Sequence, residues 1–133
     1  MSGALAGVRI IDLTTVLMGP FATQQLGDLG ADVIKVEPPT GDTSRNVGHA
    51  RHRGMANGFL HVNRNKRAIV LDLKQPAGRE ALLRLCAGAD VLVYNVRPQA
   101  MARLELTYAD VAAVNPRILY VGMFGYGQRG PYA

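Results

Sequence analysis

Hydrophobic runs and polar segments alternate along this chain in a pattern that predicts strands separated by helices. Five apolar runs rich in β-branched residues stand at residues 8–13, 32–37, 68–73, 90–96 and 117–124. Each run has the length of a strand, and its apolar residues do not alternate strictly with polar ones. We therefore expect five strands that are apolar on both faces.

The segments between these runs carry helical signals. Pro20 suits the first turn of a helix that precedes the second run, and Gly30 can close that helix in a left-handed conformation. Residues 76–87 place apolar side chains on one face, which predicts a second helix. Two shorter helices are expected to begin at Pro98 and at Thr107, the latter with a Thr-x-x-Asp start that resembles a capping box.

Residues 38–58 show no sustained period and are rich in Gly, Pro, Ser, Asn and basic residues. We expect a long loop there. Loops of about twenty residues are uncommon in compact domains and are often binding loops, lids or mobile segments.

Strands that alternate with helices predict an α/β fold, with a parallel sheet covered by helices on both faces. Ligands bind such sheets outside the carboxyl ends of the strands. The residues expected at those ends are 12–19, Glu37, 72–74, 95–97 and 125–131.

Composition fits one domain or part of one, with 133 residues of which 48% are hydrophobic and 19% charged. The net charge of +5 favours an anionic partner. The basic residues are dispersed and aromatic residues make up only 6%, so we do not expect nucleic-acid binding.

The single cysteine, Cys86, excludes an internal disulfide and fits a reducing compartment. Its place on the apolar side of a predicted helix indicates a buried structural thiol. No signal peptide is visible and no apolar run has membrane-spanning length, so we expect a cytoplasmic protein that does not bind a membrane.

Several kinds of catalytic or cofactor site find little support. Glu37 stands where an acidic residue could hold the ribose of a dinucleotide, but the turn after the first strand lacks G-x-G-x-x-G, and a solvated carboxylate is the preferred interpretation. Walker and G-x-S-x-G motifs are missing. His49, His52 and His61 lack metal-ligand spacing, so no metal is expected.

Three basic residues follow the predicted strand ends and could contact phosphate groups: Lys74, Arg97 and Arg103. Several charged hydrogen bonds to one anion would contribute substantially to its binding free energy, whereas isolated exposed ion pairs contribute little free energy. Their spacing does not show whether they converge, and each alone is best read as a solvated surface charge.

Three stretches of the chain resemble the N-terminal part of class III CoA-transferases, the L-carnitine dehydratase/bile-acid-inducible family. They are "LAGVRIIDLTTVLMGPFATQQLGDLGADVIKVEPP", "NRNKRAIVLDLKQPAGREALLRLCAGADVLVYNVRP" and "LYVGMFGYGQRGPYA". The resemblance covers nearly the whole chain, and its motifs G-A-D-V-I-K-V-E, L-D-L-K and G-Y-G-Q-x-G-P occur in the family's order.

The resemblance implies a Rossmann-like large domain, of which residues 1–133 would be the N-terminal part, and a smaller second domain outside this chain. It also implies an interlocked homodimer that uses acyl-CoA and a carboxylic acid as substrates. Coenzyme A contacts would come from the following residues: Thr15, Val16 and Leu17; Leu71, Asp72, Leu73 and Lys74; Asn95, Val96 and Arg97; and Arg103.

The family's transferase mechanism uses an aspartate that takes up the acyl group and then CoA, which divides one difficult exchange into easier steps. That aspartate is expected beyond Ala133, so no catalytic residue is expected in this chain and the segment alone should be inactive. A racemase of the α-methylacyl-CoA type, and a CoA-binding module without chemistry, are the alternatives.

Three positions depart from formyl-CoA transferase. Leu17 replaces a glutamine and cannot donate a hydrogen bond, which argues against an oxalate/formyl substrate pair. Pro38 replaces an arginine and so removes a possible contact to CoA, which Arg45, Arg51 or Arg53 could make instead. Val96 replaces an aromatic residue.

Arg64, Lys66 and Arg67 enter the third predicted strand at the end opposite Lys74. We expect them to serve the structure or a dimer contact, whereas the Asp72-Leu73-Lys74 end should hold CoA.

Overall fold

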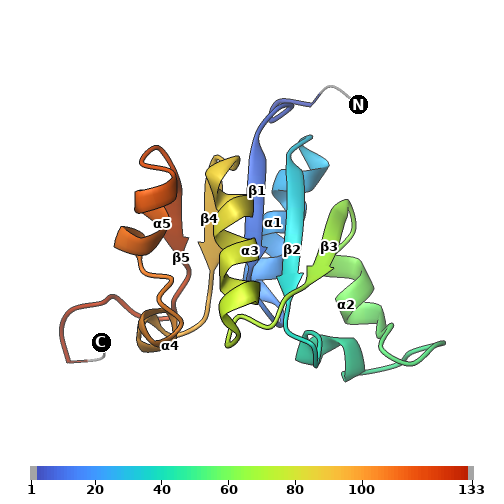
Figure 1. Cartoon of the computed structure of the whole chain (residues 1–133). Coiled ribbons are helices and arrows are strands. Elements are labelled where there is room, and N and C mark those ends of the chain that lie inside the picture. Colours follow the sequence, from blue (N-terminus) through green and yellow to red (C-terminus); the bar gives the residue numbers. More distant parts are fainter. Residues whose placement is uncertain (1–2, 132–133) are drawn as a thin grey trace.

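The computed structural model describes residues 3–131 and contains a five-stranded parallel sheet (Figure 1). Its strands are β1 (Arg9–Leu13), β2 (Asp32–Glu37), β3 (Lys66–Val70), β4 (Val91–Tyr94) and β5 (Leu119–Gly122). Their order across the sheet is β3-β2-β1-β4-β5. This is the strand order of Rossmann folds, and the predicted α/β architecture is confirmed.

Helices cover both faces of the sheet. They are α1 (Met18–Asp28), α2 (Asn57–Val62), α3 (Pro76–Ala87), α4 (Pro98–Arg103) and α5 (Tyr108–Val114), with a short 3₁₀ helix, η1 (Thr43–Asn46). Figure 1 shows α3 and α5 on one face of the sheet and α1 behind it. The main-chain path therefore follows the predicted alternation of strand and helix.

Alternate residues of β1 enter two different cores. Ile11 packs with Leu82 of α3 and Val111 of α5, whereas Ile10 packs with Val33 of β2 on the face that α1 covers. Burial on both faces explains why these strands read as continuous apolar runs. Cys86 belongs to the first core, where burial raises its pKa to about 11, so the predicted structural thiol is confirmed.

Helix ends follow the expected chemistry. Gly30 adopts a φ of 101° just after α1. Thr107 and Asp110 form the predicted capping box: the Thr107 side chain accepts from the Asp110 amide, and the Asp110 carboxylate accepts from the Thr107 amide at 2.8 Å.

Strand boundaries differ from the apolar runs. The third run predicts a strand over 68–73, but β3 begins at Lys66 and ends at Val70. After Val70 the chain turns, with the Gln75 amide donating to the Asp72 carbonyl at 3.0 Å. Leu71 and Leu73 are apolar because they pack against the core from this turn, which apolar content alone does not distinguish from a strand.

The expected loop over residues 38–58 is partly wrong. It contains η1, and α2 begins at Asn57. The predicted loop missed α2 because its six residues span too few turns to show helical periodicity. Phe59 and Val62 nevertheless bury their side chains and attach α2 to the molecule.

Candidate functional site

The loops that follow β1, β2, β3 and β4 meet at one edge of the sheet and enclose an apolar cavity of about 210 Å³. Its lining includes Thr15 after β1, Pro38 after β2, residues 71–74 after β3 and Val96 after β4. Leu104, just after α4, completes it. The structure thus brings together predicted residues from three separate sequence segments.

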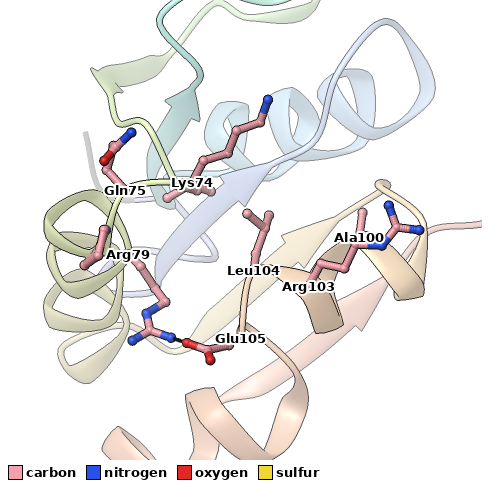
Figure 2. A pocket seen from close by; sticks show the side chains of 9 residues that line it. Lys74, Gln75, Arg79, Ala100, Arg103, Leu104 and Glu105 are labelled. Atoms are coloured by element: carbon pink, nitrogen blue, oxygen red, sulfur yellow. Dashed lines mark ion pairs between the residues drawn. The ribbon is translucent and has the colours of Figure 1, made fainter.

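A second hollow, of about 480 Å³, adjoins this cavity between the start of α3 and the end of α4. Leu73, Lys74 and Leu104 line both spaces. Figure 2 shows Arg79 of α3 meeting Glu105 in an ion pair, while the Lys74 and Arg103 side chains extend away from that pair.

A third hollow, of about 700 Å³, lies between α4 and the glycine-rich turn and is lined by Arg97, Arg103 and Phe124 among others. Arg103 lines both the second and third hollows. Within residues 3–131, Lys74, Arg97 and Arg103 form no ion pair. Three cations without a carboxylate partner therefore border neighbouring spaces at the carboxyl edge of the sheet.

Gly78 allows α3 to approach the turn that carries Asp72 and Lys74. A Cβ atom at Gly78 would lie 2.1 Å from the Asp72 carbonyl oxygen. The Lys74 amide also donates to the Asp72 carboxylate at 3.1 Å, so the turn is fixed by its own side chain. This packing holds Lys74 at the rim of the first two spaces.

The loop after β1 exposes Val16 and Leu17 while its backbone is held firmly. Asn95, which follows β4, accepts from the Thr15 amide and donates to the Thr15 carbonyl, both at 2.9 Å. Val16 has a φ of 71°, a conformation that β-branched residues rarely adopt. The predicted residue Asn95 therefore uses its side-chain amide to hold the predicted residue Thr15.

A buried ion pair at the same edge was not predicted. Lys35 Nζ lies 3.0 Å from Asp42 Oδ2, and the two side chains are 1% and 0% exposed. Burial acts to raise the pKa of Asp42, but hydrogen bonds from Ser44 and Lys35 outweigh burial and lower it. A lysine inside an apolar strand signals such a pair, because a buried charge requires a partner.

Glu37 is not the solvated carboxylate that the sequence suggested, since it is only 3% exposed. Arg45 donates to its two oxygens, each at 2.7 Å, and the Asp42 amide donates to it at 2.9 Å. Burial acts to raise the pKa of Glu37, but these bonds lower it overall. Arg45 also stacks on Phe59 at 3.8 Å, so its guanidinium is held by contacts within the chain.

The basic cluster at the amino end of β3, formed by Arg64, Lys66 and Arg67, makes ion pairs within the chain, which agrees with the expected structural role. Lys66 Nζ lies 3.0 Å from Asp12 Oδ2, and its side chain is 2% exposed. Burial lowers the pKa of Lys66, against the opposing effect of Asp12. Arg67 pairs with Asp32, and Arg64 pairs with Asp28.

Among residues 3–131, no three His, Cys, Asp or Glu side chains gather as a metal site. In the same part of the chain, no helix has the length and apolar content to cross a membrane.

Residues 5–133 match the sequence pattern of CoA-transferase family III. The chain belongs to this family. It is 48% identical to succinyl-CoA:glutarate CoA-transferase of Mus musculus over 128 residues, which cover 96% of the chain and 29% of the mouse protein. It is 46% identical to an acyl-CoA transferase of Fusarium pseudograminearum over 139 residues, which cover 98% of the chain and 30% of that protein.

The structure agrees with this membership. A CAIB/BAIF family protein from Brucella suis superimposes with a TM-score of 0.93 at 39% identity, covering 99% of this chain and 36% of that one. The family III chain therefore spans about a third of the length of the relatives it matches. The expected family and the expected fold are both confirmed.

Proposed function

We propose that this family III chain forms the CoA-binding edge of an acyl-CoA:carboxylate CoA-transferase. The observation that carries the proposal is the gathering of Lys74, Arg97 and Arg103 around neighbouring hollows, without ion-pair partners among residues 3–131. Coenzyme A carries several phosphate oxygens, and arginine and lysine bind such groups through charge-assisted hydrogen bonds. The adjoining apolar cavity offers space for the less polar arm that ends in the thioester.

The proposed contacts to coenzyme A come from the residues that the family resemblance indicates: Thr15, Val16, Leu17, Leu71, Asp72, Leu73, Lys74, Asn95, Val96, Arg97 and Arg103. Most of them border the three spaces. Asn95 would act through Thr15, because its side-chain amide already bonds the Thr15 backbone on both sides.

The chemical step would belong to an aspartate beyond Ala133. Its carboxylate attacks the acyl-CoA carbonyl, forming a mixed anhydride and releasing the CoA thiolate. The thiolate attacks the aspartyl carbonyl, which yields an aspartyl-CoA thioester and the free donor acid. The acceptor carboxylate attacks the aspartyl-CoA carbonyl, which forms a second mixed anhydride and releases the CoA thiolate. The thiolate then attacks the acceptor's own carbonyl carbon, so that the new acyl-CoA forms and the aspartate carboxylate leaves unchanged.

Titration calorimetry with coenzyme A tests the binding site. The experiment uses the full-length protein, which is this chain together with the downstream residues that the proposal requires. Lys74→Ala and Arg97→Ala should each weaken binding by about tenfold at low salt, the effect of losing one charged hydrogen bond. The loss should shrink at high salt, because screening removes the wild-type advantage.

Arg117→Ala is the matched control, since Arg117 is an exposed arginine near the amino end of β5, away from the three spaces. It should bind coenzyme A like the wild type. Unchanged affinity in Lys74→Ala and Arg97→Ala at both salt concentrations would show that these residues are ordinary surface charges.

The reaction itself is tested with succinyl-CoA and glutarate, the substrates in the name of the mouse relative. Transfer of CoA to glutarate supports the proposed function. Exchange of the proton α to the thioester without transfer would indicate a racemase, and binding without either reaction would indicate a CoA-binding module.

The interlocked homodimer and the cytoplasmic location are part of the same proposal. Family resemblance supports the dimer, and the single buried cysteine fits a reducing compartment. Sedimentation of the full-length protein at twice the monomer mass would support the dimer.

A further inference from the structure

The loop that follows β1 holds an unfavourable backbone conformation at an exposed position. Val16 has a φ of 71°, and its side chain and that of Leu17 are exposed. A β-branched residue keeps such a conformation only when its surroundings impose it, and residues of this kind concentrate at functional sites.

The Lys35–Asp42 ion pair contacts the backbone on both sides of Thr15. Lys35 Nζ donates to the Thr14 carbonyl at 2.8 Å, and the Val16 amide donates to the two Asp42 carboxylate oxygens at 3.2 and 3.3 Å. The ion pair thus joins the strained residue to the end of β1 through its two partners.

Asp42 is itself held in place from the other side. Its Oδ1 accepts from the Ser44 amide at 2.9 Å and from the Ser44 hydroxyl at 2.7 Å, and its amide donates to Glu37. The Asp42 carboxylate is therefore held in place by contacts other than its bond to the Val16 amide. Asp42 caps the amino end of η1, so the position of the loop after β1 depends on the segment that follows β2.

Packing confines the same loop. A Cβ atom at Gly19 in the first turn of α1 would lie 2.4 Å from Thr14 Cβ, so Thr14 has no room to move toward the helix.

An ion pair as buried as this one is costly, and an apolar pair of similar volume often serves a core equally well. An apolar pair could not, however, accept from the Val16 amide or donate to the Thr14 carbonyl. The ionic groups are the ones that the loop requires.

We propose that Lys35 and Asp42 are positioning residues of the transferase, which hold the backbone of residues 14–16 in the conformation that receives the acyl-CoA. This inference rests on the proposed function. The loop reaches the cavity through Thr15, which lines it, and Asn95 holds Thr15 from β4. A backbone set in advance loses less conformational freedom when the substrate binds.

Asp42→Asn and Lys35→Met in the full-length protein test the role of the pair. Small displacements of a positioning loop reduce rates strongly, so we expect kcat/KM for acyl-CoA to fall by at least about tenfold, measured well below the melting temperature. Amide hydrogen exchange over residues 14–17 should quicken in both variants.

Val111→Ala is the matched control, because Val111 is fully buried in α5 and lines none of the three spaces. It should lower the melting temperature while keeping kcat/KM and the exchange of residues 14–17 near wild type. If Asp42→Asn and Lys35→Met lower the melting temperature but keep both of these readouts, the pair is merely structural and the proposal is wrong.

The wild-type protein supplies a test that does not depend on the variants folding. Before coenzyme A is added, the Val16 amide should already exchange slowly, because Asp42 holds it. Fast exchange there in the free protein would overturn the positioning role. A protein with slow exchange but no CoA transfer would instead contradict the proposed function alone.

Discussion

Glu37 and Asp42 keep buried carboxylates ionised because hydrogen-bond donors surround each of them. Arg45 and the Asp42 amide donate hydrogen bonds to the Glu37 carboxylate. Ser44 and Lys35 donate to the Asp42 carboxylate. Burial opposes ionisation in both residues, yet both pKa values end below their usual values of 4.5 and 3.8.

These lowered pKa values predict acid sensitivity. Well above pH 4.5 both groups are ionised in the folded and unfolded chains, and their contribution to stability is complete. As the pH falls further, the unfolded chain takes up protons first, so the free energy of unfolding should decrease until the folded pKa values are passed. Urea denaturation between pH 6 and pH 3 measures this decrease; Asp42→Asn should show a shallower one, and an equal slope would contradict the assignment to Asp42.

Glu105 occupies the left-handed position after α4, with a φ of 53°. The Leu106 amide donates to the Met101 carbonyl and the Glu105 amide to the Ala102 carbonyl, which is the bonding of a Schellman motif that usually carries glycine. Glu105→Gly should raise the free energy of unfolding by about 0.5 kcal/mol, because relief of strain exceeds the loss of the exposed Arg79 pair. Glu105→Ala keeps the strain and loses the pair, so denaturant titration should show no gain for this control.

At the scale of elements, α5 depends on its capping box, since its seven residues are too few to be stable alone. Thr107→Ala removes the side-chain acceptor for the Asp110 amide and should lower the free energy of unfolding by about 1 kcal/mol. Thr107→Ser retains the acceptor, so its free energy of unfolding should fall much less. Thermal denaturation of the two variants and the wild type measures these losses. Equal losses in the two variants would show that the Thr107 methyl group, and not the cap, stabilises this end of the helix.

At the scale of the whole molecule, the carboxyl edge of the sheet carries ion pairs such as Lys35–Asp42 and, beside them, cations that have no carboxylate partner among residues 3–131. Arg9, Arg67 and Asp32 form ion pairs near the amino edge of the sheet, whereas Lys74 and Arg103 at the carboxyl edge form none within residues 3–131. The carboxyl edge is thus left with positive charge available to an anion, which agrees with the proposed binding of coenzyme A.

The proposed division of labour assigns the chemical step to an aspartate beyond Ala133. It predicts that purified residues 1–133 exchange no CoA between succinyl-CoA and glutarate. Chromatographic separation of the acyl-CoA products measures the exchange, with the full-length protein as the positive control. Turnover by residues 1–133 would show that the chemistry resides in this chain and would refute the downstream aspartate.

Local patterns of the sequence were sufficient to predict the parallel sheet, the helix over residues 76–87 and the capping box at Thr107. Each depends on neighbouring residues: continuous apolar runs, helical spacing, or a Thr-x-x-Asp start. Because parallel strands all end at one edge, the same patterns placed Lys74 and Arg97 at that edge, with Arg103 in the segment that follows.

Only the tertiary structure decided which of these groups meet. Nothing in the local sequence around Lys35 names Asp42 as its partner, and nothing around Asn95 names Thr15, 80 residues earlier. The environment of Glu37 was mistaken for the same reason, since Arg45 and the Asp42 amide reach it only after the following loop folds back. Secondary structure follows from short-range periodicity, whereas the burial and pairing of charges depend on segments that folding brings together.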